Sequence, residues 1–160
     1  MNAEIISIGS ELLRGEIADT NSFYLAAQLS LLGIPLCFTV QVGDNQQRLV
    51  EALKQAWERS QLIITTGGLG PTQDDLTREA IADLLEEELK VDPTLEQELR
   101  AMFVRWGREM PSRNIKQATL IPSARAIPNP RGTAPGWWVE KDERTILAMP
   151  GPPSEMERMW

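Results

Sequence analysis

Apolar residues follow two different spacings along the first two thirds of the chain. Short, mainly apolar runs, which are typical of buried strands, stand at 4–8, 36–42 and 62–65. Elsewhere apolar residues recur every three or four positions, which predicts helices at 23–32, 49–57, 76–85 and 95–106. Strands that alternate with helices of this length predict a mainly parallel sheet with helices on both faces.

The last third of the chain has a different character. Proline and glycine are frequent between 111 and 135, so we expect long loops with short strands there. Residues 137–140 and 145–148 predict a small β hairpin, and a final helix begins near Pro153 and is cut short at Trp160. The length fits one domain, so we expect a single three-layer α/β/α domain over residues 1–160, the N-terminal part of a longer chain.

The composition excludes several classes of function. A net charge of −7 argues against binding to nucleic acid or to an anionic membrane, because both need basic surface patches. The chain has no histidine, so a metal site must use oxygen ligands, which favours Mg²⁺ or Mn²⁺ over zinc. Its single cysteine, Cys37, lies in an apolar strand and is expected to be buried. Since the chain shows neither a membrane-spanning run nor a signal pattern, we expect a cytoplasmic protein.

The segment 65–77 carries the strongest indication of a ligand site. It reads Thr-Thr-Gly-Gly-Leu-Gly-Pro-Thr-Gln-Asp-Asp-Leu-Thr and joins a strand to the start of a helix. Glycines in such a turn let backbone N–H groups approach an anion, and the helix N-terminus adds unpaired donors. We therefore predict that a phosphate or nucleotide binds here, in contact with Thr66, Gly67, Gly68, Gly70 and Thr72.

Two acidic residues, Asp74 and Asp75, stand just before the same helix. Two carboxylates would repel a diphosphate unless a divalent cation is shared between carboxylate and phosphate oxygens. We therefore predict that both residues hold a cation and act in catalysis. The simpler alternative is that one aspartate caps the helix and the other complements its dipole.

Other loops are expected to meet this glycine-rich loop, because ligands bind at the carboxyl ends of parallel strands. The loop after the first strand brings Gly9, Glu11, Asp19 and Asn21, and the loop after the second strand brings Asp44. The three carboxylates among them are candidates for metal binding or water activation. Asn21 either caps the first helix or contacts the ligand.

Two later segments are expected to line the same pocket. Asn129, Gly132 and Thr133 lie in a stretch suited to close backbone contact with a ligand, although they could form only a connecting turn. Pro150 and Gly151 leave another strand and enter the final helix.

The tryptophans divide into two groups. Trp57 and Trp106 fall on apolar helical faces and are expected in the core. Trp137 and Trp138 are consecutive in a strand and must point to opposite faces, so one of them should be exposed or face the pocket.

Several motifs, in order along the chain, are similar to those of the competence/damage-inducible CinA family, in its N-terminal molybdopterin-binding-like domain of the MogA/MoaB type. They stand at 8–22, 42–44, 65–77, 129–136 and 147–156. Together they cover most of the loops that the predicted sheet brings to one edge.

The resemblance implies three alternative functions. The first is metal-dependent hydrolysis of a nucleotide diphosphate such as ADP-ribose, with Mg²⁺, Mn²⁺ or Co²⁺ as the cation. The second is molybdopterin binding or adenylyl transfer, as in molybdenum-cofactor proteins. The third is a non-catalytic nucleotide-binding module that accompanies a C-terminal nicotinamide-nucleotide amidase domain.

One difference in the glycine-rich segment favours the hydrolase. The pattern of the cofactor enzymes resembles Thr-Gly-Gly-Thr-Gly followed by Arg-Asp, whereas this chain has Leu69 at the fourth position and Asp74 in place of the arginine. An aspartate in place of the arginine removes a side chain that binds phosphate directly and adds a carboxylate that can bind a metal ion. The resemblance also implies a homo-oligomer, either a dimer or a trimer. Trp137 and Trp138 stand beside the apolar residues 146–147, so we expect the subunit contact there.

Overall fold

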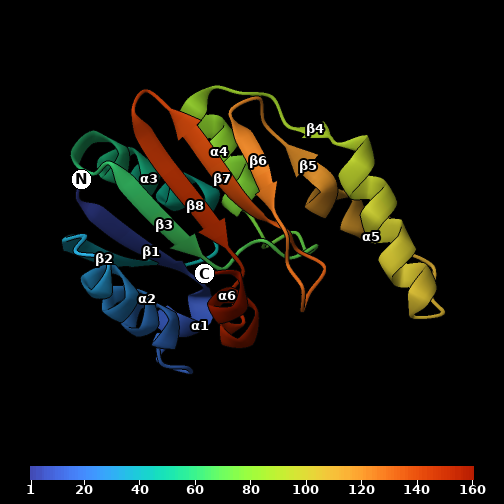
Figure 1. Ribbon diagram of the computed structural model, residues 1–160, viewed down its shortest axis with the longest axis horizontal. Coiled ribbons are helices and arrows are strands. Elements are labelled where there is room, and N and C mark those ends of the chain that lie inside the picture. The colour runs from blue at the N-terminus through green and yellow to red at the C-terminus, as the bar shows by residue number, and fades with distance from the viewer.

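The computed structural model describes all 160 residues and is built around one six-stranded sheet (Figure 1). The strand order is β2-β1-β3-β8-β7-β6. Four strands run parallel: β1 (Ala3–Ile8), β2 (Leu36–Val42), β3 (Leu62–Thr66) and β8 (Arg144–Met149). The antiparallel strands β7 (Gly136–Lys141) and β6 (Ala124–Ile127) extend the sheet at one edge. The predicted hairpin and the mainly parallel sheet are confirmed.

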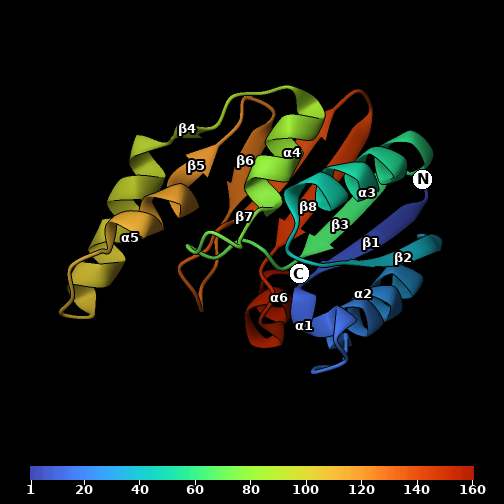
Figure 2. The ribbon, with the colours of Figure 1, turned by 180° about the vertical axis from the view of Figure 1, so that it is seen from behind.

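Helices cover both faces of the sheet, which gives the expected three layers (Figures 1 and 2). On one face lie α2 (Thr20–Leu31) and α6 (Pro153–Met159), and on the other lie α3 (Gln46–Arg59) and α4 (Thr77–Leu85). A one-turn helix, α1 (Ser10–Leu13), interrupts the loop predicted after β1.

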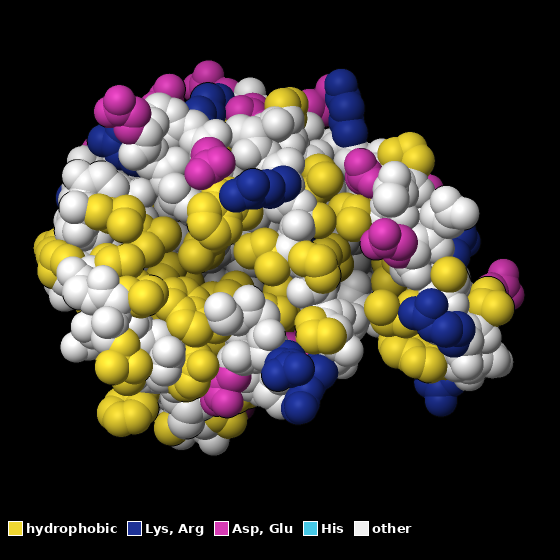
Figure 3. Space-filling model, in the orientation of Figure 1, with side chains coloured by type: hydrophobic (Ala, Val, Ile, Leu, Met, Phe, Trp, Pro, Cys, Tyr) yellow, Lys and Arg dark blue, Asp and Glu magenta, His cyan; other side chains and the backbone are white.

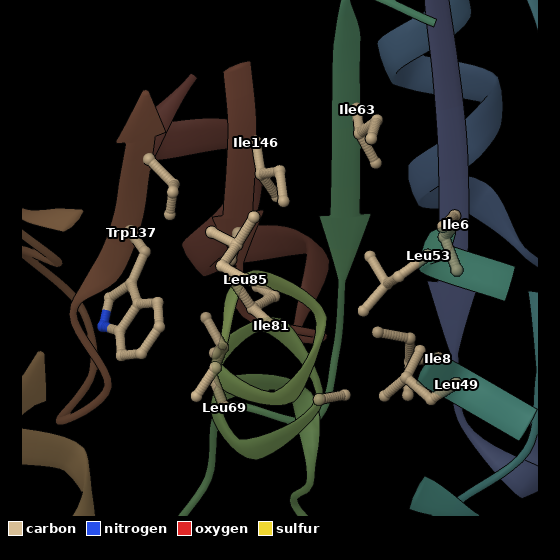
Figure 4. Close-up of a cluster of buried hydrophobic side chains, with 14 of the residues drawn as sticks. Ile6, Ile8, Leu49, Leu53, Ile63, Leu69, Ile81, Leu85, Trp137 and Ile146 are labelled. Carbon is tan, nitrogen blue, oxygen red and sulfur yellow. The ribbon is translucent and has the colours of Figure 1, made fainter. Parts of the chain in front are cut away.

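The two faces of the sheet bury separate hydrophobic cores, because successive side chains of a strand point to opposite sides. Ile5 and Ile64 pack against Leu25 of α2 on one face. On the other face Ile6 and Ile63 join the larger cluster with α3 and α4, which also includes Trp137. Figure 4 shows this cluster, with Leu69 of the glycine-rich loop beside Trp137. The burial of Leu69 anchors that loop to the core.

The segment between α4 and β6 forms a side lobe. It contains β4 (Lys90–Val91), α5 (Pro93–Arg105), the 3₁₀ helix η1 (Ser112–Ala118) and β5 (Thr119–Leu120). Strands β4 and β5 pair with each other and not with the main sheet. Leu99, Phe103 and Met110 make a small hydrophobic cluster of their own, so α5 projects away from the body of the molecule (Figures 1 and 2).

Two burial predictions were wrong, and both concern residues at the margin of the fold. Cys37 is exposed because β2 is an edge strand whose outer half no helix covers. Trp106 is 53% exposed because it ends the projecting helix α5 and packs only edge-on against Phe103. Trp57, which was expected in the core, is half-buried and packs against the larger core. No helix in the structure combines the length and the apolar composition that a membrane crossing would need.

Trp137 and Trp138 point to opposite faces of β7, as the alternation of a strand requires. Trp137 is fully buried in the larger core, so the prediction that it takes part in a subunit contact is wrong. Trp138 is half-buried opposite Leu147 of β8, and the guanidinium of Arg125 lies 4.7 Å from its ring centre. Neither indole lines the cleft described below.

Candidate functional site

The carboxyl ends of the four parallel strands open into a cleft of about 640 Å³. Its size lies within the range of roughly 300–1,000 Å³ that is usual for sites that bind small molecules. The loops after β1, β2, β3 and β8 all contribute to it. Most of the predicted site residues meet here: Gly9, Glu11, Asn21, Asp44, Thr66, Gly67, Gly68, Gly70, Asp74, Asp75, Thr133, Pro150 and Gly151.

Two glycines shape the floor of the cleft because no other residue fits their positions. Gly67 has φ 99° and Gly68 has φ 66°, in the region that favours glycine. A Cβ on Gly67 would strike the carbonyl oxygen of Ile8, and a Cβ on Gly68 would strike the Oγ1 of Thr77. The glycine-rich loop therefore lies directly against the end of β1 and the start of α4.

The backbone N–H groups of this loop divide into engaged and free donors. Gly67 N–H donates to the carbonyl of Met149 over 2.9 Å, and Gly70 N–H donates to Asp75 Oδ1 over 2.9 Å. The N–H groups of Gly68 and Leu69 have no partner within the chain. Of the three predicted glycine donors, only Gly68 is therefore open to an anion without a rearrangement of the loop.

Asp75 braces the glycine-rich loop from within. Its carboxylate accepts hydrogen bonds from Gly70 N–H, from Thr72 N–H over 2.8 Å and from Thr72 Oγ1 over 2.5 Å. Lys116 of η1 completes the turn by donating to the carbonyls of Thr72 and Asp75. The N-cap position of α4 is Leu76, with no side-chain cap, so the alternative that an aspartate caps this helix is wrong.

Other carboxylates in the cleft are less engaged. The carboxylates of Asp74 and Glu11 have no hydrogen-bond partner in the chain, whereas that of Asp44 accepts from Ser10 N–H over 3.0 Å. The cleft is lined by six carboxylate residues and by no lysine or arginine: Glu11, Asp19, Asp44, Asp74, Asp75 and Glu155. No group of three of them is close enough to form a metal site by itself. The cleft is therefore acidic without a preformed cation cage.

Asp19, a candidate metal ligand from the sequence, caps α2, whereas Asn21, a candidate cap, bonds to the loop after β8. Asp19 is the N-cap of α2 and accepts from Ser22 N–H over 3.0 Å, so the prediction that Asn21 caps this helix is wrong. Burial alone would raise the pKa of Asp19, but the nearby Ser7 hydroxyl and hydrogen bonds from Ser22 and Gln41 outweigh it and lower the pKa.

Asn21 instead connects α2 to the loop after β8, and both segments line the cleft. Its Nδ2 donates to the carbonyl of Gly151 over 2.8 Å, and its buried Oδ1 has no partner. A buried acceptor without a donor costs free energy, which a ligand hydroxyl or amine would recover. This orphan oxygen is a candidate contact for a substrate.

Three predicted site residues lie beside the cleft and do not line it. Thr72 is exposed on the outer side of the glycine-rich loop. Asn129 accepts from Gly132 N–H and donates to Glu155 Oε2 over 2.7 Å, and it shares a smaller neighbouring cavity with Gly132. Their roles in binding stay predictions.

The sequence did not indicate the role of Arg78, a buried residue of α4 that connects the glycine-rich loop to the segment before β7. Its side chain is 1% exposed and donates to the carbonyl of Leu69 over 2.7 Å and to that of Pro135 over 3.1 Å. Burial lowers the pKa of Arg78 to about 10. An arginine in the first turn of a helix usually faces solvent, so only the three-dimensional contacts reveal this role.

Comparison with known proteins assigns the family. Residues 4–160 match the family model described as "Probable molybdopterin binding domain". The chain is 56% identical, over its whole length, to a CinA-like protein of Thermomicrobium roseum, and 53% identical to a CinA-like protein of Deinococcus radiodurans. It spans about 39–40% of the length of these relatives.

Solved structures give the same assignment. The crystal structure of the protein CinA from Thermoplasma acidophilum superposes with a TM-score of 0.89 at 33% identity, over 99% of this chain and 92% of that one. The molybdopterin biosynthesis enzyme MoaB from Thermus thermophilus shares the fold, with a TM-score of 0.65 at 21% identity over 99% of this chain and 86% of that one. The chain therefore belongs to the family of probable molybdopterin-binding domains and is a CinA-like member of it.

Proposed function

We propose that this domain hydrolyses a nucleotide diphosphate such as ADP-ribose in the cleft at the carboxyl ends of the parallel strands, with the help of a divalent cation. The observation that carries the proposal is the composition of the cleft walls. Free backbone donors at Gly68 and Leu69 suit a phosphate, whereas the surrounding side chains are acidic and none is basic. A diphosphate is compatible with such walls only when a cation accompanies it.

The donor set fits a hard cation. Asp74 and Glu11 carry carboxylates without partners, and Asp44 has one oxygen without a hydrogen bond. Mg²⁺ and Mn²⁺ prefer such oxygens, and Mg²⁺ is usually held by one or two carboxylates together with substrate phosphates. The lack of a preformed three-carboxylate group agrees with that mode. When bound, the cation would offset the charge of the diphosphate and lower the pKa of a water molecule.

The residues of the chain then have separate tasks. The Gly68 and Leu69 N–H groups hold one phosphate, while the Asp75 brace keeps the loop in the shape that exposes them. Water forms a bond to one phosphorus, the bridging P–O bond breaks, and its electron pair leaves with the departing phosphate. Since the chain has no histidine, a cleft carboxylate or solvent takes the proton.

The orphan oxygen of Asn21 supplies a contact for the sugar. It lies in the same cleft wall as Gly151 and needs a hydrogen-bond donor. A ribose hydroxyl is such a donor. We therefore assign Asn21 to the ribose next to the diphosphate.

A molybdopterin-binding or adenylyl-transfer function is the second candidate, because the family model and the fold of the MoaB enzyme both point to it. Two residues disfavour it. Leu69 is buried in the larger core and offers no side-chain hydroxyl to a ligand, and Asp74 places a negative charge at the mouth of the loop.

A nucleotide-binding module for an amidase domain remains the third candidate, since the relatives are longer than this chain.

The deciding experiment is turnover of a panel of nucleotide diphosphates with Mg²⁺, Mn²⁺, Co²⁺ or EDTA. We expect cation-dependent release of a nucleoside monophosphate, and Asp74→Asn should abolish it. Tight binding of a pterin without hydrolysis of any diphosphate would favour the second candidate.

A further inference from the structure

A second, smaller cavity adjoins the cleft on the side of α5. It has a volume of about 150 Å³ and lies between α5, the end of η1 and the loop that follows β6. Figure 3 shows an indentation between the projecting α5 lobe and the body, with hydrophobic side chains on both sides of it. Gln117 and Thr133 line both cavities, so the two spaces share a wall.

We propose that this second cavity, the α5 cavity, is a subsite for the base of the nucleotide whose diphosphate lies in the cleft. The inference rests on the proposed function, because the diphosphate places the base within reach of the shared wall. It adds a specificity pocket that the cleft alone does not provide.

The lining of the α5 cavity suits a flat uncharged ring. Leu95, Leu99 and Met102 of α5 form one mainly apolar side, where Glu98 adds a carboxylate, and Pro135 stands among the residues opposite. No lysine or arginine lines the cavity, so it is not a second site for an anion. A cavity of roughly this volume holds one benzene-sized ring, so it would take the six-membered ring of a base, and the rest of a purine would lie at its opening.

Polar groups at the shared wall can recognise the edge of a base. The Nε2 of Gln117 is 3.5 Å from the carbonyl oxygen of Leu69, at the limit of a hydrogen bond, so this amino group loses little when it donates to a ligand instead. Its Oε1 accepts from Asn114 over 2.8 Å, which fixes the position of the side chain. Thr133 adds a hydroxyl without a partner in the chain.

The geometry also connects the base to the phosphate. Gln117 approaches Leu69, whose N–H group is one of the two free donors for the phosphate. Leu69 and Gln117 both line the cleft, and Gln117 also lines the α5 cavity, so a ligand at the Leu69 N–H lies next to the wall that the two cavities share.

The test measures binding and not turnover. Met102→Trp places a large side chain in the α5 cavity, and Val104→Trp is the matched control, because Val104 is 72% exposed on the same helix and lines neither cavity. Because the tryptophan would fill the space that the base occupies, we expect Met102→Trp to weaken ADP-ribose binding at least about fivefold. Ribose 5-phosphate, which has no base, should bind both variants and the native chain equally. Leu95→Phe serves as a second, smaller obstruction if Met102→Trp does not fold.

A direct probe completes the experiment. Adenosine alone should shift the NMR signal of the Met102 methyl group. Unchanged ADP-ribose affinity in a folded Met102→Trp or Leu95→Phe variant, or adenosine shifts confined to other residues, would overturn the subsite. If adenosine binds at Met102 while no diphosphate is hydrolysed with any cation, the subsite stands and the proposed hydrolysis fails.

Discussion

Replacement of Asp75 by alanine tests whether this residue acts as a structural brace as well as a site residue. The substitution removes the acceptor of three hydrogen bonds, two from backbone N–H groups and one from the Thr72 hydroxyl. Bonds to a charged group contribute about 1.5–3 kcal/mol each when buried. Gly70 is only partly buried and Thr72 is exposed, so water can replace part of the lost hydrogen bonding. We therefore expect the free energy of unfolding to fall by roughly 2–3 kcal/mol.

The measurement is thermal unfolding followed by circular dichroism. For a domain of this size, 1 kcal/mol shifts Tm by about 2–4 °C, so Asp75→Ala should lower Tm by roughly 4–12 °C. The matched control is Asp74→Ala, which removes a carboxylate without a partner one position away and should change stability by less than about 0.5 kcal/mol. Equal shifts in the two variants would refute the assignment of the brace to Asp75.

Three further predictions concern the loop, pH and assembly. Gly67→Ala should lower Tm far more than Gly15→Ala, because a Cβ strikes the Ile8 carbonyl at the first and meets open space at the second; similar melting curves would contradict this. The lowered pKa of Asp19 means that its contribution to stability is present above its unfolded pKa and is lost as pH falls through the folded value. The stability difference between native chain and Asp19→Asn, measured by urea unfolding, should therefore shrink below pH 3.8; a constant difference would exclude it. Light scattering should show an oligomer that Trp138→Ala weakens, because Trp138 and Leu147 pair across β7 and β8 and neither is fully buried; a monomer at every concentration would end this prediction.

The fold could be predicted from the sequence because its local signals agree with one another. Each parallel strand is mainly apolar, and each covering helix begins soon after a glycine-containing turn. The failures lie where burial depends on a distant element. Cys37 has the pattern of a buried strand residue, but only the strand order places β2 at the edge. Trp106 lies on an apolar face, but α5 projects from the body.

The loops of the site could be identified from the sequence, whereas the division of labour within them could not. Spacing along the chain brings the loops after β1, β2, β3 and β8 together, because all four strands are parallel. Which side chain caps, braces or stays free depends on hydrogen bonds between segments. Asn21 reaches Gly151, which is 130 residues away, and Arg78 reaches Pro135. No local pattern encodes those contacts.

The central claim is that the acidic cleft handles a diphosphate together with a cation. The most direct test is the hydrolysis of ADP-ribose by the native chain and by Asp74→Asn, each with Mg²⁺ and with EDTA. The account predicts AMP and ribose 5-phosphate from the native chain with Mg²⁺ alone, and no product from a fully folded Asp74→Asn. Equal product formation with EDTA, or native activity in Asp74→Asn, would contradict it.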